Sequence, residues 1–158
     1  MAIILNLREL EKFLTKEGKG SIVLTGGCFD ILHIGHVRFF SKAKKMGDYL
    51  IVLLESDKKV KKLKGRNRPL FIQKERAEML SALRSVDLIV LLPTIENDSD
   101  YLNLVMKIKP DIIAVTANDP AIEKKRSQAK KIGGKLKVIS FTKTYSTSEL
   151  AEILSKNI

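Results

Sequence analysis

Residues 26–36 hold the side chains best suited to chemistry, in the order Gly-Gly-Cys-Phe-Asp-Ile-Leu-His-Ile-Gly-His. The apolar run 22–24 predicts a strand before them, and residues 37–46 predict a helix after them. His33 and His36, the two histidines of the chain, therefore fall where this helix begins and can share one side of it. A helix N-terminus offers free N–H groups and a partial positive charge. This pattern favours a site for a phosphate group, above all one that gains negative charge during a reaction.

A second group of polar side chains lies near the end of the chain. Residues 145–150 read Tyr-Ser-Thr-Ser-Glu-Leu and predict the start of a helix. The hydroxyls of Ser146, Thr147 and Ser148, with the free N–H groups there, are suited to hold a phosphate. The alternative interpretation is a capping box, in which Ser146 caps the helix and Glu149 completes the cap.

A third group is the basic stretch 61–69, Lys-Lys-Leu-Lys-Gly-Arg-Asn-Arg-Pro. Lysines are compact charges on flexible stems, so Lys61 and Lys64 are suited to clamp phosphates. The alternative is an ordinary solvated loop. Arg76 follows in the first half of a predicted helix, where an isolated arginine would normally lie on the surface.

Alternating helices and strands must position these groups. Apolar periodicity and turn residues predict helices over 7–16, 34–46, 71–83, 98–108, 120–132 and 146–154, strands over 21–25, 49–54, 87–92, 111–115 and 136–141, and a long basic loop over 56–70. This alternation is typical of right-handed βαβ units, so we expect an α/β fold with a doubly wound, parallel five-stranded sheet. Such sheets bind ligands beyond the carboxyl ends of their strands. We therefore expect residues 26–36 and 146–148 to face one crevice there.

Length and composition set further expectations. A chain of 158 residues with 44% hydrophobic residues predicts one domain, 1–158, in which residues 1–20 form a leading helix and connector. No apolar run reaches the roughly 18 residues that span a bilayer, and the start is too soon charged for a signal peptide. Cys28 is the single cysteine, which excludes an internal disulfide. We expect a cytoplasmic protein without membrane association.

The formal net charge of +11 admits nucleic acid, a membrane surface or small anionic ligands as partners. The lysines cluster in predicted loops and on helix faces. Aromatic residues make up only 6% of the chain and do not interleave with them, so no base-stacking surface is evident. We expect most of this charge to be solvated and no specific binding of nucleic acid.

The motifs at residues 27–30 and 33–36 resemble, together, the HxGH signature of the cytidylyltransferase-like nucleotidyltransferases. Residues 146–148 are similar to the Ser-Thr-Thr/Ser stretch with which that family grips a triphosphate. Residues 63–69, Leu-Lys-Gly-x-x-Arg-Pro, are similar to the nucleotidyltransferase domain of ADP-heptose synthases. The resemblance covers residues 7–154, extends to glycerol-3-phosphate cytidylyltransferase, and implies a Rossmann-like nucleotidyltransferase fold and a homodimer.

The resemblance also implies roles for individual side chains. The catalytic residues would be His33, His36 and Lys61. The residues that bind the nucleotide would be Gly26, Gly27, Cys28, Phe29, His33, His36, Ser146, Thr147 and Ser148. The residues that bind the acceptor would be Asp30, Lys64, Arg76 and Asp119. No residue is expected to ligate a metal, and Mg²⁺ would bridge the triphosphate oxygens and keep several waters.

The implied reaction transfers AMP or CMP from ATP or CTP to a phosphorylated sugar or polyol, with release of pyrophosphate. Two alternatives stay open: adenylylation of flavin mononucleotide, and a non-catalytic protein that binds nucleotides or nucleic acid. ADP-heptose synthase domains carry Lys-Gly-Gly-Asp-Tyr after the fourth strand, whereas residues 116–120 here are Thr-Ala-Asn-Asp-Pro. We therefore expect heptose 1-phosphate to be a poor acceptor, and the choice between ATP and CTP stays open.

Overall fold

The structure is a computed structural model that describes residues 1–16, 20–140, 145 and 147–156. A parallel sheet forms its centre, in the strand order β1-β4-β3-β2-β5-β6. The strands are β1 Ile3–Asn6, β2 Ile22–Gly27, β3 Tyr49–Leu54, β4 Leu88–Leu91, β5 Ile112–Thr116 and β6 Lys135–Ile139. From β2 the chain first builds one half of the sheet and then returns to add β5 and β6 on the other side, so the switch in strand order lies at β2. The predicted α/β, doubly wound fold is confirmed.

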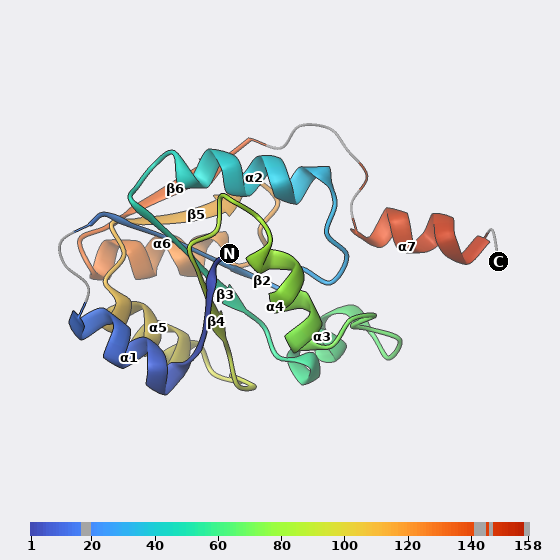
Figure 1. Ribbon diagram of the computed structural model, residues 1–158, viewed down its shortest axis with the longest axis horizontal. Helices are drawn as coiled ribbons and strands as arrows, with labels where there is room; N and C mark the ends of the chain where they lie inside the picture. Colours follow the sequence, from blue (N-terminus) through green and yellow to red (C-terminus); the bar gives the residue numbers. More distant parts are fainter. Residues whose placement is uncertain (17–19, 141–144, 146, 157–158) are drawn as a thin grey trace.

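Helices cover both faces of this sheet. They are α1 Leu7–Lys16, α2 Ile34–Lys44, α3 Asp57–Lys64, α4 Gln73–Ser81, α5 Asp98–Ile108, α6 Ile122–Lys131 and α7 Thr147–Lys156. One buried cluster joins the sheet to α1, α5 and α6, and a second joins the opposite face to α2 and α4. Figure 1 shows α2 along one side of the sheet and α1, α5 and α6 along the other.

The middle strand β3 explains why both faces must be covered. Leu50, Val52 and Leu54 point into the cluster under α2 and α4. Ile51 and Leu53 point into the cluster under α1 and α5. Since each fully buried side chain of this size contributes about 1.5–3 kcal/mol, the uninterrupted apolar run gains from burial only between two layers of helices.

The sheet has six strands and not the expected five, because residues 3–6 form β1 at the edge beside β4. Ile3 and Ile4 are 50% and 39% exposed. A four-residue edge strand buries too little to leave a clear apolar pattern, and residues 1–20 therefore hold a strand before their helix.

The segment after β3 also differs from expectation, since residues 57–64 of the predicted basic loop form α3. Ser56 caps this helix, and its Oγ accepts the N–H of Lys59 at 3.2 Å. Val60 is fully buried, whereas Leu63 is 58% exposed. A single buried apolar residue gives no helical period, which is why the lysine-rich composition suggested a loop.

Candidate active site

The start of α2 brings His33 and His36 together. His33 occupies the N-cap position in extended backbone, and its Nδ1 accepts the N–H of Gly35 at 3.1 Å. The Nδ1 of His36 accepts the N–H of His33 at 3.3 Å. The two rings stack with their centroids 3.9 Å apart. Because both Nδ1 atoms accept, each neutral ring carries its hydrogen on Nε2, and no described residue accepts from that N–H at the helix start.

Burial fixes the charge of this pair. It lowers the pKa of His33, and it lowers the pKa of His36 to about 4, with a smaller contribution from the charge of His33. Both rings are therefore neutral at pH 7. They act on an anion as hydrogen-bond donors, beside the positive end of the α2 dipole.

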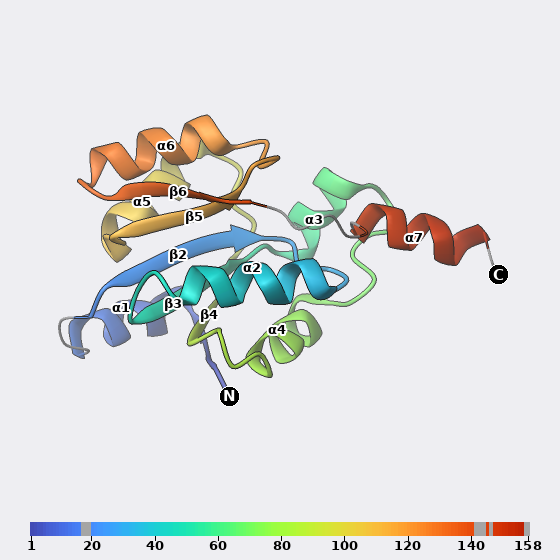
Figure 2. The same cartoon turned by 90° about the horizontal axis from the view of Figure 1, so that it is seen from above.

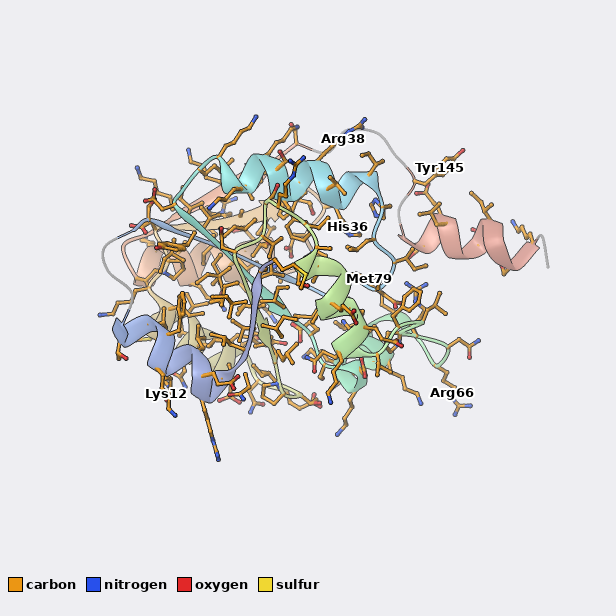
Figure 3. The ribbon with its side chains drawn as sticks, viewed as in Figure 1. Lys12, His36, Arg38, Arg66, Met79 and Tyr145 are labelled. Carbon is orange, nitrogen blue, oxygen red and sulfur yellow. The ribbon has the colours of Figure 1, made fainter. Side chains whose placement is uncertain are left out.

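The turn before α2 holds His36 in place. Phe29 has a left-handed backbone, with φ 45°, and its ring meets the His36 ring edge-on at 5.4 Å. On its other side the Phe29 ring packs against Phe40 at 5.0 Å. A Cβ at Gly27 would lie 3.0 Å from the Phe29 ring, so only glycine leaves that ring its place. Figure 3 shows His36 beneath the start of α2.

Asp30 ties this turn to the loop before α4. Its side chain is 2% exposed, and Oδ1 accepts the N–H groups of Leu70 at 2.8 Å and Phe71 at 3.2 Å. Oδ2 lies 2.5 Å from Arg68 Nε, off the line of a hydrogen bond, and forms an ion pair with it. These contacts position the turn, and the acceptor contact expected of Asp30 from the sequence stays a prediction.

Arg76 lies beneath the site with its side chain 0% exposed. Its guanidinium donates to the carbonyl oxygens of Phe71 at 3.0 Å, Cys28 at 2.5 Å and Glu55 at 2.8 Å, and to Asp57 at 2.7 Å. The side chain therefore joins the ends of β2 and β3 to α3. In this arrangement Arg76 holds the floor of the site, and its contact with the acceptor stays a prediction.

Lys61 and Lys64 lie in the last turn of α3, and both are exposed. Neither forms an ion pair among the described residues, whereas Lys62 pairs with Glu96 at 2.7 Å. The charge of Lys64 lies close enough to Cys28 to oppose the rise in the pKa of its thiol that burial causes. Lys64 thus stands near the turn that precedes the histidines. Figure 3 shows Arg66 reaching away from the body just beyond it.

Sequence reasoning missed a polar cluster at the carboxyl end of β3. Glu55 follows the strand, and its carboxylate accepts the Tyr101 hydroxyl at 2.8 and 3.0 Å. Lys59 Nζ lies 5.5 Å from the centre of the Tyr101 ring. Burial raises the pKa of Glu55. The available signal was a charged residue directly after a buried apolar strand, but Tyr101 lies 46 residues further along the chain and gave none.

Asp119 follows β5 at the same edge of the sheet. Its Oδ1 accepts the N–H of Ala121 at 2.8 Å, and its Oδ2 pairs with Lys125 at 2.6 Å. Both side chains are largely buried, with 14% of Asp119 and 23% of Lys125 exposed. Asp119 therefore orders the start of α6, and a direct contact with the acceptor would compete with Lys125.

The predicted hydroxyl group lies at the start of α7. Ser146 lies outside the described residues, while Thr147 and Ser148 open the helix. Figures 1 and 2 show α7 beyond the carboxyl ends of the strands and apart from the other helices. The predicted grip of residues 146–148 on a triphosphate stays a prediction.

Comparison with known proteins places the chain among relatives. Residues 24–153 match the Cytidylyltransferase-like family. The chain is 42% identical over 143 residues to the Bifunctional protein HldE of a Nitratiruptor species, which covers 90% of this chain and 29% of that protein. It is 45% identical over 113 residues to the Bifunctional protein HldE of Campylobacter concisus, covering 72% and 23%. The chain thus spans about a quarter to a third of the length of these relatives.

Solved structures agree with this placement. The lipopolysaccharide core biosynthesis protein from Thermoplasma volcanium GSS1 superposes with a TM-score of 0.64 at 29% identity, covering 80% of this chain and 100% of that one. Pantoate-beta-alanine ligase from Francisella tularensis superposes with a TM-score of 0.68 at 16% identity, covering 99% and 77%, which shows a likeness of fold alone. From the match over residues 24–153, the chain belongs to the cytidylyltransferase-like family of nucleotidyltransferases.

Proposed function

We propose that this chain transfers AMP or CMP from ATP or CTP to the phosphate of a phosphorylated sugar or polyol, and releases pyrophosphate. The observation that carries this proposal is the histidine pair at the start of α2, whose Nδ1 atoms accept backbone N–H groups and whose Nε2–H groups have no acceptor among the described residues. The name of the Thermoplasma protein, in lipopolysaccharide core biosynthesis, supports a carbohydrate acceptor.

The reaction needs charge stabilisation more than proton transfer. An oxygen of the acceptor phosphate attacks the α-phosphorus in line, the bond to the bridging oxygen breaks, and pyrophosphate leaves. That oxygen is already ionised at pH 7, so no general base is required. Nε2–H of His33 and His36 donates to the α-phosphate and bridging oxygens as their charge grows. Lys61 and Lys64 supply mobile positive charge for the outer phosphates of the nucleotide and the acceptor.

The nucleotide would lie across the carboxyl end of β2. Gly26, Gly27, Cys28 and Phe29 would line its near side, and residues 146–148 would approach the triphosphate from α7. Gly26 has no side chain, so its backbone is open to the nucleotide. Within the protein, a Cβ at this position would meet Leu53 at 3.4 Å.

Mg²⁺ enters this proposal only as the partner of the triphosphate. Among the residues that the structure describes, no group of three or more His, Cys, Asp or Glu side chains is placed to hold a metal ion. The donors present therefore suit an ion that arrives on phosphate oxygens and keeps its waters. Bound in this way, it would neutralise part of the triphosphate charge.

Two wider expectations also remain proposals. Residues 1–158 would form one nucleotidyltransferase domain that works as a homodimer.

In the described part of the chain, the helices are all too short or too polar to cross a bilayer.

A substrate panel tests the proposal. Pyrophosphate release would be measured with ATP and with CTP against glycerol 3-phosphate, glucose 1-phosphate, heptose 1-phosphate and flavin mononucleotide. We expect release with at least one sugar or polyol phosphate, and its loss in the double variant His33→Ala, His36→Ala. Release with flavin mononucleotide alone would show that the acceptor is a flavin nucleotide and not a sugar or polyol phosphate. No release with any acceptor would overturn the enzymatic proposal.

A further inference from the structure

Glu55 is fixed beside the turn that carries the histidines. It is the first residue after β3, and its backbone N–H donates to the carbonyl oxygen of Gly27 at 3.1 Å. Its own carbonyl oxygen accepts Arg76 Nη2 at 2.8 Å. Both backbone groups are thus bound to the floor of the site, so the side chain leaves a rigid base at the carboxyl edge of the sheet.

The carboxylate of Glu55 is held from one side by Tyr101. The Tyr101 hydroxyl donates its one hydrogen toward both oxygens, at 2.8 and 3.0 Å. Tyr101 in turn lies under Lys59, whose Nζ is fixed on the Ile95 carbonyl oxygen at 2.8 Å. Among the described residues, the Tyr101 hydroxyl is the side-chain donor to this carboxyl group, and the two carboxyl oxygens can accept further hydrogen bonds.

A positive charge from α6 also acts on Glu55. Lys125 of α6 is close enough to lower the pKa of Glu55 against the effect of burial, and its Nζ is held by Asp119 at 2.6 Å. Glu55 directly follows β3, next to β2 in the sheet, while Lys125 lies on α6. A sugar hydroxyl can donate its hydrogen to the carboxylate that Tyr101 holds in place.

We propose that Glu55, positioned by Tyr101, binds hydroxyl groups of the acceptor, so that the chain selects polyhydroxylated phosphate monoesters over monoesters without hydroxyls. This inference rests on the proposed transfer reaction and names the residue that sets its acceptor specificity. A site with a buried polar group discriminates strongly, because an acceptor without the matching hydroxyl leaves that group unpaired.

Steady-state kinetics of E55Q and Y101F test the proposal, with glycerol 3-phosphate or glucose 1-phosphate, whichever the wild type uses, and ethyl phosphate as the acceptor without hydroxyls. For E55Q we expect KM for the hydroxylated acceptor to rise about 10- to 100-fold, as for loss of one charged hydrogen bond. KM for the nucleotide and kcat/KM with ethyl phosphate should stay within about twofold, since neither uses this group. Y101F should act in the same direction by about three- to tenfold, because it removes one neutral hydrogen bond.

Lys62→Ala is the matched control, because Lys62 shares α3 with Lys59 and, among the described residues, pairs with the exposed Glu96 alone. It should leave the ratio of kcat/KM values for the two acceptors unchanged. If E55Q and Y101F lower both acceptors equally, the pair is structural and the inference is overturned. An unchanged ratio in an active enzyme also overturns it, while a wild type that releases no pyrophosphate with any acceptor overturns the proposed function first.

Discussion

The two edges of the sheet use their polar groups in opposite ways. At the amino edge, three aspartates accept the first N–H groups of the strands: Asp48 from Ser21 at 2.8 Å, Asp87 from Leu50 at 2.7 Å and Asp111 from Ile22 at 2.7 Å. Asp87 also pairs with Lys44 at 2.7 Å. These carboxylates are occupied by the fold itself.

The amino edge nevertheless has a cavity of about 680 Å³. Its lining is mainly apolar and includes Phe13, Leu14, Ile51, Leu83 and Val86. In the described part of the chain, the carboxyl edge instead presents donors without an acceptor: the histidine Nε2–H groups, Lys61 and Lys64. If the proposed reaction takes place at this edge, polar groups at strand ends locate the chemistry in this fold better than the volume of a cavity does.

The largest expected effect comes from His36→Ala. Removing one donor aimed at developing charge lowers turnover by about 10²- to 10³-fold, with a smaller change in nucleotide affinity. Pyrophosphate release under saturating substrate measures it. Arg38→Ala, an exposed change on the same helix, is the control and should keep turnover within about twofold. Near-normal turnover in His36→Ala would contradict the proposed catalytic role of the carboxyl edge.

Substituting one arginine at each edge compares how much the two edges contribute to the free energy of unfolding. Arg76→Met should lower the free energy of unfolding by about 3–5 kcal/mol, because it removes a fully buried side chain that donates to three carbonyl oxygens and to Asp57. Arg84→Met, at the exposed rim of the amino-edge cavity, should change it by less than about 0.5 kcal/mol. Urea unfolding measures both. Equal effects would show that the hydrogen bonds of Arg76 contribute no more to the free energy of unfolding than the exposed Arg84 does.

Acid should weaken the fold through the site itself. The folded pKa of His36 is about 4, against 6.5 for an unperturbed histidine. Between these values the unfolded chain binds more protons, so stability is fully present above pH 6.5 and falls as the pH drops toward 4. The limit of this contribution is about 3 kcal/mol. Urea unfolding from pH 7 to 4.5 measures it, and His36→Gln should have a shallower decline. Parallel curves for the two proteins would show that His36 does not titrate in this range.

Apolar sequence patterns within single helices and strands predicted much of the fold. The bounds of α1, α5 and β3 agree with the predicted ranges 7–16, 98–108 and 49–54, because each has its own apolar period or run. The sequence also predicted that His33 and His36 lie together, because residues three apart at the start of a helix fall on the same side of it. Where a signal lies within one element, the sequence was sufficient.

Long-range partners were beyond such patterns. Nothing near Arg76 distinguishes a surface arginine from one whose partners lie on β2, β3 and α3. The bond between Glu55 and Tyr101 joins two elements that only the sheet topology brings together. Sequence reasoning therefore named residues around the site but could not foresee that Arg76 and Asp30 would be buried in contacts with other parts of the chain.

The smallest expected effect tests the amino edge directly. Ala82 lies at the exposed C-cap of α4 and lines the cavity there, so Ala82→Trp would fill part of that space without burying a polar group. The free energy of unfolding should change by less than about 1 kcal/mol. kcat/KM should stay within about twofold, because no substrate group is placed at this edge. Thermal unfolding and pyrophosphate release give the two readings. If a folded Ala82→Trp protein instead lost more than about tenfold in kcat/KM, the cavity would take part in substrate binding, and the division between a structural and a chemical edge would fail.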